Sequence, residues 1–91
     1  MYIRVTRGRF SPANTDEAVR IARDQLIPVL KQRPGFRSYR AGLNHDAGTL
    51  IAISEWDTRE QAQEGGMVRG PFEALGIRFE APEIFEVTVE A

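Results

Sequence analysis

Apolar and polar side chains alternate in three separate stretches of the chain, and such alternation predicts β-strands. The first stretch is 2–9, and the last is 83–90. Between them, the runs FRSYRAGL and TLIAISEW flank the turn residues NHDAG, a pattern typical of a β-hairpin over 36–56. The first and last stretches predict one strand each and the hairpin predicts two, so four strands are expected.

The segment between the first strand and the hairpin has the spacing of a helix with one buried stripe. Its start is indicated by the polar and acidic run 14–17, and its end by Arg33-Pro34-Gly35. Pro28 lacks a backbone donor, so we expect a kink or break near Asp24 and Gln25. The stripe consists of Val19, Ala22, Leu26, Val29 and Leu30.

A second helix follows the hairpin. Thr58 and Gln61 fit a capping box at its start. Gly65-Gly66 interrupts it, Gly70-Pro71 opens a further helical piece, and 76–82 is expected to be a connection. The order β-α-β-β-α-β predicts one α+β domain over 1–91, a ferredoxin-like fold with a four-stranded antiparallel sheet and both helices on one face.

The register of the hairpin decides which side chains face the helices. The simplest register pairs Gly42 with Leu50. It predicts a helix-facing core of Ile3, Val5, Tyr39, Ala41, Leu43, Ile51, Ile53, Phe85 and Val87. The opposite face then carries Phe36 together with Arg4, Thr6, Ser38, Arg40, Leu50, Ser54, Trp56, Glu86 and Thr88.

That opposite face is too apolar to remain in water, because it carries Phe36, Leu50 and Trp56. A second copy of the chain would cover these side chains and leave a polar-lined space between the two sheets. The sequence therefore predicts a homodimer.

Composition narrows the function classes. The chain is 42% hydrophobic and 27% charged with a net charge of −1, so no general attraction to nucleic acid or to an anionic membrane is expected. It has no cysteine, which excludes disulfides, thiolate nucleophiles and Cys-ligated zinc. The sequence has neither a signal-peptide pattern nor a membrane-length apolar run, so a cytosolic location is expected.

The order and spacing of these elements resemble the antibiotic biosynthesis monooxygenase (ABM) domains of the dimeric α/β-barrel superfamily. The similar pieces span most of the chain: MYIRVTRGRF, Pro34-Gly35-Phe36, LIAISEWDTREQA, Gly70-Pro71-Phe72 and IFEVTVE. The resemblance implies a dimer whose sheets face each other, with a ligand pocket between sheet and helices in each protomer. Some members oxygenate aromatic hydroquinones with no metal or flavin, because the substrate's own carbanion reduces oxygen, and others degrade haem.

The resemblance also bears on individual residues. A tryptophan at the end of the third strand contributes to the pocket in both characterised types, and Trp56 matches it. Haem degraders carry a histidine on the second helix, whereas this chain has no histidine between Thr58 and Ala91. They also carry an asparagine near the end of the first strand, where this chain has Thr6-Arg7. Haem degradation is therefore not expected. Cofactor-free oxygenases can carry an asparagine shortly before the tryptophan, where this chain has Ala52 and Ser54.

Two residues are the catalytic candidates. Trp56 offers a large π-face for stacking a flat ligand, although a tryptophan is also a usual core or interface residue. Arg40 in mid-strand would hold a phenolate, enolate or carboxylate; the alternative is a salt bridge to Glu86 or to the partner chain. The hydroxyl candidates for substrate binding are Thr6, Ser38 and Ser54; the alternative is that these hydroxyls only form hydrogen bonds to neighbouring residues. A cover over the pocket would have Met67 and Phe72 as its apolar lining.

Other titratable residues give weaker signals. His45 lies in the turn and is expected to be a solvated loop residue, and the chain has no second histidine for a metal site or triad. Glu83 and Glu86 would serve as a general base only inside a pocket. The sequence thus favours a cofactor-independent oxygenase acting on an aromatic, quinone-like or enolisable small molecule. The alternative is a non-catalytic domain of the same fold that binds a small molecule or serves in assembly.

Overall fold

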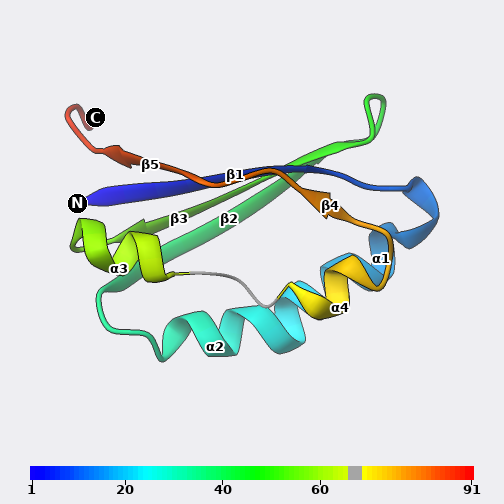
Figure 1. Ribbon diagram of the computed structural model, residues 1–91, viewed down its shortest axis with the longest axis horizontal. Helices are drawn as coiled ribbons and strands as arrows, with labels where there is room; N and C mark the ends of the chain where they lie inside the picture. The colour runs from blue at the N-terminus through cyan, green and yellow to red at the C-terminus, as the bar shows by residue number, and fades with distance from the viewer. Residues whose placement is uncertain (66–68) are drawn as a thin grey trace.

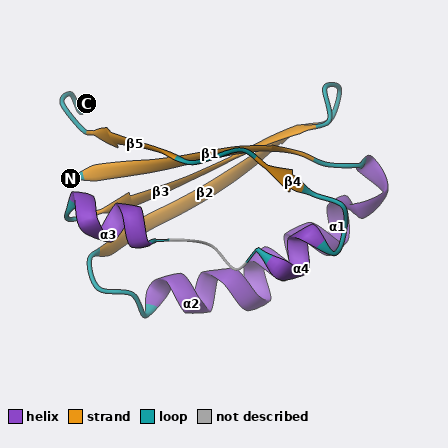
Figure 2. Ribbon diagram, viewed as in Figure 1, coloured by secondary structure: helices purple, strands orange, loops and turns teal. Residues whose placement is uncertain are grey.

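The computed structural model describes residues 1–65 and 69–91, and it consists of one antiparallel sheet with helices packed along one face (Figures 1 and 2). The elements are β1 (Tyr2–Arg9), η1 (Pro12–Asn14), α1 (Thr15–Ile21), η2 (Ala22–Leu26), α2 (Ile27–Lys31), β2 (Phe36–Asn44), β3 (Thr49–Trp56), α3 (Arg59–Glu64), α4 (Gly70–Glu73), β4 (Arg78–Phe79) and β5 (Glu83–Glu86).

The sheet has the strand order β2-β3-β1, and both β4 and β5 pair with the free edge of β1. With β4 and β5 sharing the last strand position, this is the predicted ferredoxin-like arrangement. Two boundaries differ from the prediction. The expected connection 76–82 contains β4, and the last strand ends at Glu86 rather than at the predicted residue 90.

The α-helical hydrogen-bonding pattern of the first helical segment is interrupted where the sequence indicated. The helix α1 passes into a π-helical stretch, η2, and then into α2. Pro28 has no N–H to offer the carbonyl of Asp24, so the regular α-helical hydrogen bond cannot form at this point. At the second helix the predicted capping box is confirmed, with Thr58 and Gln61 each bonded to the backbone of the other.

The hairpin register is where the sequence prediction fails. Phe36 lies opposite Trp56 as predicted, but a bulge at Arg37 then shifts the pairing by one residue, so that Ser38 faces Glu55 and Leu43 faces Leu50. The predicted pairing of Gly42 with Leu50 is wrong, because Gly42 lies opposite Ile51. The extra residue moves the side chains of β2 to the other face of the sheet relative to β3.

As a result, the residues of β1, β3 and β5 lie on the face opposite to the predicted one, whereas those of β2 beyond the bulge lie on the predicted face. The helix-side face carries Tyr2, Arg4, Thr6, Tyr39, Ala41, Leu43, Leu50, Ala52, Ser54 and Trp56. The outer face, opposite to the helices, carries Ile3, Val5, Ser38, Arg40, Ile51, Ile53, Glu55 and Phe85. The more apolar side of β1 and β3 is therefore the side that no described helix covers (Figure 1).

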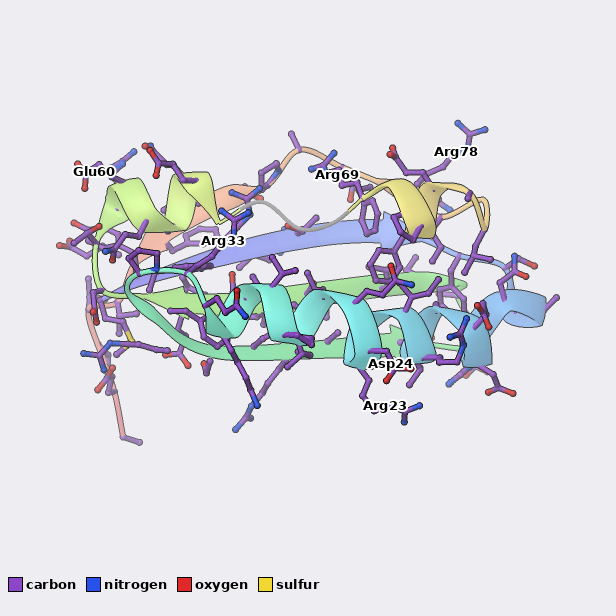
Figure 3. The ribbon with its side chains drawn as sticks, turned by 90° about the horizontal axis from the view of Figure 1, so that it is seen from below. Arg23, Asp24, Arg33, Glu60, Arg69 and Arg78 are labelled. Carbon is purple, nitrogen blue, oxygen red and sulfur yellow. The ribbon has the colours of Figure 1, made fainter. Side chains whose placement is uncertain are left out.

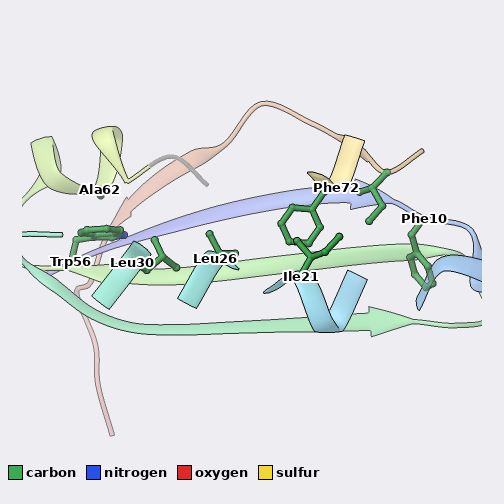
Figure 4. Close-up of a cluster of buried hydrophobic side chains, with 8 residues drawn as sticks. Phe10, Ile21, Leu26, Leu30, Trp56, Ala62 and Phe72 are labelled. Atoms are coloured by element: carbon green, nitrogen blue, oxygen red, sulfur yellow. The ribbon is translucent and has the colours of Figure 1, made fainter. Parts of the chain in front are cut away.

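The core lies between the sheet and the helices. Its largest fully buried side chains are Trp56, Leu26 and Leu30 (Figure 4). The edge of Phe36 meets the indole of Trp56 at a centroid distance of 5.5 Å. Gly65 closes over the same indole, since a Cβ at this position would lie 2.4 Å from Cζ2 of Trp56. Among the described residues, no helix is long and apolar enough to cross a membrane.

The close approach of Gly65 to Trp56 gives a prediction about stability. Gly65→Ala would press a methyl group into an indole that is 1% exposed, so we expect the free energy of unfolding in urea to fall by about 1–3 kcal/mol. Gly70→Ala is the matched control, because a Cβ added there would have no atom within 4 Å and the residue begins a helix. Equal unfolding free energies for both variants would contradict this packing.

Candidate functional site

A cavity of about 100 Å³ lies between the sheet and the first helical segment. Its walls are almost entirely carbon, and it reaches the surface beside Val19, which is 48% exposed. The lining residues are Ala18, Val19, Ala22, Tyr39, Ala41, Leu43, Leu50, Ala52, Phe72, Ile77 and Phe79. Such a space suits the apolar body of a small molecule.

A second, polar hollow adjoins the cavity, because both are lined by Tyr39 and Ala52. Its volume of about 10 Å³ is enough for one water-sized group. Its remaining lining residues are Arg4, Thr6, Leu30, Ser54 and Gly65. The two hollows together form one site with an apolar body and a polar end, which we call the sheet–helix site.

Strand pairing assembles the polar end. Arg4 on β1, Ser54 on β3 and Tyr39 on β2 lie side by side across three strands. Thr6 is two residues along β1 on the same face, opposite Ala52. Side chains in such a row point the same way, so a guanidinium and three hydroxyl groups converge beneath the helices.

Arg4 is the dominant group of this polar end. It is 8% exposed, and its Nη1 donates hydrogen bonds of 2.9 Å to the carbonyl oxygens of Ala62 and Gln63 in the last turn of α3. These carbonyls are the negative end of the helix dipole, which favours a cation there. Burial lowers the pKa of Arg4, and the nearby Arg69 and Arg33 lower it further.

The hydroxyl groups of Ser54 and Tyr39 can both donate a hydrogen bond to a ligand. Ser54 Oγ accepts a 2.8 Å hydrogen bond from Nε1 of Trp56, so the Ser54 hydroxyl proton is free to donate elsewhere. Burial raises the pKa of the Tyr39 phenol to about 12. Tyr39 is therefore a neutral donor at physiological pH, and it is not a base.

The structure divides the predicted site residues between the two faces. Thr6 and Ser54 line the polar hollow and Phe72 lines the apolar cavity, so these three lie in one site. Trp56 borders this site only through its bond to Ser54, because its ring is 1% exposed. Its predicted stacking role stays a prediction and would need the ring to be uncovered. Met67 lies outside the described residues.

Arg40 and Ser38 lie on the outer face, which corrects the prediction that they share a face with Trp56. The bulge at Arg37 places Arg40 opposite Ile53, and Ser38 donates a hydrogen bond to Glu55. The alternative salt bridge from Arg40 to Glu86 is not formed, since Glu86 lies opposite Tyr2 on the helix-side face. A ligand-binding role for Arg40 now requires a site between two copies of the sheet.

The other titratable residues do not enter the sheet–helix site. His45 is exposed in the hairpin turn, as predicted, and contacts the edge of Phe10. Glu83 and Glu86 are exposed, and Glu83 pairs with Arg7 at 3.1 Å. Within residues 1–65 and 69–91, no group of three His, Asp or Glu side chains is placed to hold a metal ion.

Sequence reasoning did not propose two of the polar-end residues, Arg4 and Tyr39, as site residues. A detectable signal existed for Arg4, because an arginine and Thr6 alternate with Ile3 and Val5 on a strand that must be central in this topology. Tyr39 required the correct hairpin register, which the bulge hides from a simple reading of alternation.

Comparison with solved structures identifies the fold. A protein from Deinococcus radiodurans assigned to the antibiotic biosynthesis monooxygenases has a TM-score of 0.72 at 13% identity, covering 100% of this chain and 96% of that chain. A mutant of SnoaB, a cofactor-independent oxygenase from Streptomyces nogalater, has a TM-score of 0.69 at 16% identity, covering 98% and 94%. The chain has an ABM-type fold.

Another structural neighbour holds a porphyrin in its active site. A mutant of MhuD, with two manganese protoporphyrin IX molecules bound per active site, has a TM-score of 0.72 at 14% identity and covers 100% of this chain and 98% of that chain. No protein-family model and no curated protein matches the sequence. At these identities the likeness establishes the fold alone, and the ABM resemblance of the sequence is confirmed at that level.

The raised pKa of Tyr39 predicts a loss of stability at high pH. An exposed tyrosine has a pKa of about 10. Between this value and about 12 the folded protein keeps a proton that the unfolded chain has lost, so the free energy of unfolding falls as pH rises. Urea unfolding from about pH 9 to about pH 11 measures this decline. The decline should be smaller in Tyr39→Phe, and an identical decline in both proteins would contradict the burial of the phenol.

Proposed function

We propose that the protein is a small cofactor-independent oxygenase that holds an aromatic, quinone-like or enolisable molecule in the sheet–helix site. The observation that supports this most directly is the junction of a carbon-lined cavity with a cluster of hydrogen-bond donors around Arg4. The apolar part would hold the ring, and the donors would hold its oxygen. The likeness to SnoaB supports the reaction type.

The electrostatics of the polar end suit such a reaction. Oxygenation without a cofactor needs a substrate anion that can give electrons to oxygen, as the resemblance to the hydroquinone oxygenases implies. A fixed guanidinium and neutral donors in a site of low dielectric stabilise negative charge on a phenolate or enolate oxygen. Arg4 would have this role, with Thr6, Ser54 and Tyr39 as further donors.

The size of the cavity limits the substrate. At about 100 Å³ it is smaller than the engineered cavity of about 150 Å³ that accepts benzene. Even a single ring must therefore extend outward past the half-exposed Val19 or displace part of the lining. The proposal favours compact substrates over broad polycyclic ones.

A second candidate function is a non-catalytic domain that binds a small molecule. It is favoured by the lining itself, because no Asp, Glu or His is among the described residues that line either hollow. Without such a base, deprotonation depends on the substrate's own acidity. Binding without oxygen uptake would distinguish this domain from the oxygenase.

The emission of Trp56 allows a direct test, because Trp56 is the only tryptophan and is bonded to a residue of the site. We expect one chemotype in a panel of phenols, hydroquinones and quinones to quench it saturably and to be consumed together with oxygen. Ala52→Leu should weaken binding by about tenfold or more, since Ala52 lines both hollows. Oxygen uptake is measured with an electrode.

The controls lie on the outer face. Ser38→Ala and Arg40→Ala should leave binding and turnover within about twofold of the wild type, because both side chains point away from the sheet–helix site. Free tryptophan amide corrects for inner-filter loss. Unchanged turnover in a folded Ala52→Leu variant, or a large loss in Arg40→Ala, would place the chemistry outside this site.

We also propose that the protein is a homodimer whose two outer faces pack together. The outer face carries Ile3, Val5, Ile51 and Ile53 along the central strands, and its Phe85 is 43% exposed. Contiguous apolar side chains of this kind are typical of surfaces that a partner covers. A two-fold axis through this face would bring each apolar patch against its own copy.

The dimer predicts a clear effect of one charge. Phe85→Asp should convert the dimer to a monomer in size-exclusion chromatography with light scattering, because an unpaired carboxylate would be buried in the interface. Val29→Asp is the control, since Val29 is 39% exposed on α2, on the other side of the sheet. A monomeric wild type, or a dimeric Phe85→Asp, would contradict the proposed interface.

A further inference from the structure

We propose that the Arg4 end of the sheet–helix site is a carboxylate-binding site, so that the ligand of this protein is a compact organic acid with its ring in the apolar cavity. This inference rests on the proposed function for the location of the ligand, and it names the chemical class. Its support comes from unused donors, from the charges around Arg4 and from the shape of the two hollows.

Arg4 has hydrogen-bond donors that no described residue uses. A guanidinium carries five N–H donors, and the two on Nη1 are directed to the carbonyls of Ala62 and Gln63. Among residues 1–65 and 69–91, no acceptor is bonded to Nε or Nη2 of Arg4. The Nε and Nη2 groups form the edge of the guanidinium that presents two parallel N–H bonds. This edge matches the two oxygens of a carboxylate.

The Arg4 guanidinium also has no counter-charge among the described residues. No described carboxylate lies within salt-bridge distance of Arg4, and residues 66–68 carry no acid. The neighbouring charges that act on Arg4 are the cations Arg33 and Arg69, which flank the end of α3 and the start of α4 (Figure 3). A buried cation with cations around it is costly. A bound carboxylate would provide the missing counter-charge.

Arg33 strengthens this local positive field. Its Nη1 donates a 2.9 Å hydrogen bond to the carbonyl of Glu64, at the same end of α3 that binds Arg4. Its Nε is buried and has no hydrogen-bond partner among the described residues. Two guanidinium groups therefore converge on one helix end, and both keep unused donors.

The two hollows correspond to the two parts of an aromatic acid, its carboxylate and its ring. The polar hollow of about 10 Å³ is lined by Arg4 and the hydroxyls of Thr6, Ser54 and Tyr39. It has room for one carboxylate oxygen, so the second oxygen would lie toward the adjoining cavity. The adjoining carbon-lined cavity would hold the greater part of a single ring, and the rest of the ring would lie at its opening beside Val19. A neutral phenol would use the ring space but would leave the Arg4 charge uncompensated.

Benzoate and benzamide test this inference, because the two probes have nearly the same shape and differ in charge. Isothermal titration calorimetry on the whole chain should show that benzoate binds about 10- to 100-fold more tightly than benzamide, as expected for a charge-assisted pair. High salt should weaken the preference for benzoate only slightly, because Arg4 is 8% exposed and a buried ion pair is screened less than an exposed one.

The variants locate the preference. Arg4→Met should abolish it, and Arg4→Lys should reduce it several-fold, because lysine keeps the charge but loses the two-pronged edge. Arg4→Met leaves the α3 carbonyls without their donor and could therefore fail to fold. Arg4→Lys keeps a donor at this position, so it tests the preference in a folded protein. Arg7→Met is the matched control: Arg7 lies on the same strand, is 51% exposed, and points to the outer face.

Each outcome decides the inference. A benzoate preference that Arg4 variants remove and Arg7→Met keeps would establish the carboxylate site. Equal binding of both probes, no binding of either, or a preference unaffected by Arg4→Lys in a folded protein would overturn it. Failure here is distinguishable from failure of the oxygenase proposal. Uptake of oxygen with neutral hydroquinones would leave the oxygenase standing, whereas carboxylate binding without oxygen uptake would leave only the binding site.

Discussion

One extra residue in β2 determines which chemistry lies beneath the helices. The bulge at Arg37 shifts the pairing of β2 with β3 by one position, and the turn 45–48 closes the hairpin in the shifted register. The hydrogen bond from Gly48 N to Asn44 O, with Gly48 at a φ of +67°, fixes that turn. Because side chains alternate along a strand, this single shift puts Tyr39 on the same face as Ser54 and Trp56, and it puts Arg40 on the face of Ile53.

The same constraint explains why the helix-side face has an unusual polarity. A sheet normally buries its more apolar face, yet here Arg4, Thr6 and Ser54 lie under the helices. The cost is reduced because Arg4 reaches the carbonyl end of α3 and Ser54 accepts the indole N–H of Trp56. The Nε and Nη2 donors of Arg4 still have no acceptor among the described residues. A protein that only needed a core would gain stability from apolar residues here, and this polarity therefore supports the proposed ligand site.

Local signals in the sequence were sufficient to predict the helices and strands of this fold. They were not sufficient to predict which side chains face the helices. The capping box at Thr58, the break before Pro28 and the limits of β1 follow from chemistry within a few residues, and each is confirmed. The hairpin register depends on a bulge that no local pattern marks. Ile51 and Ile53 look like core residues, so alternation alone assigns them to the wrong side. Thr6 and Ser54 were correctly grouped with Trp56, whereas Arg40 and Ser38 were not.

Trp56 shows how a residue that matches a family pattern takes a different role in a particular chain. Its ring is enclosed by Phe36 and by Gly65, which approaches so closely that no side chain fits between them. The indole therefore acts on the site through its N–H, which occupies a lone pair of Ser54 and directs the serine proton away from the ring. In the proposed site, Trp56 would position Ser54 rather than touch the ligand. Among the described residues that border the two hollows of the sheet–helix site, Arg4 is the only charged one.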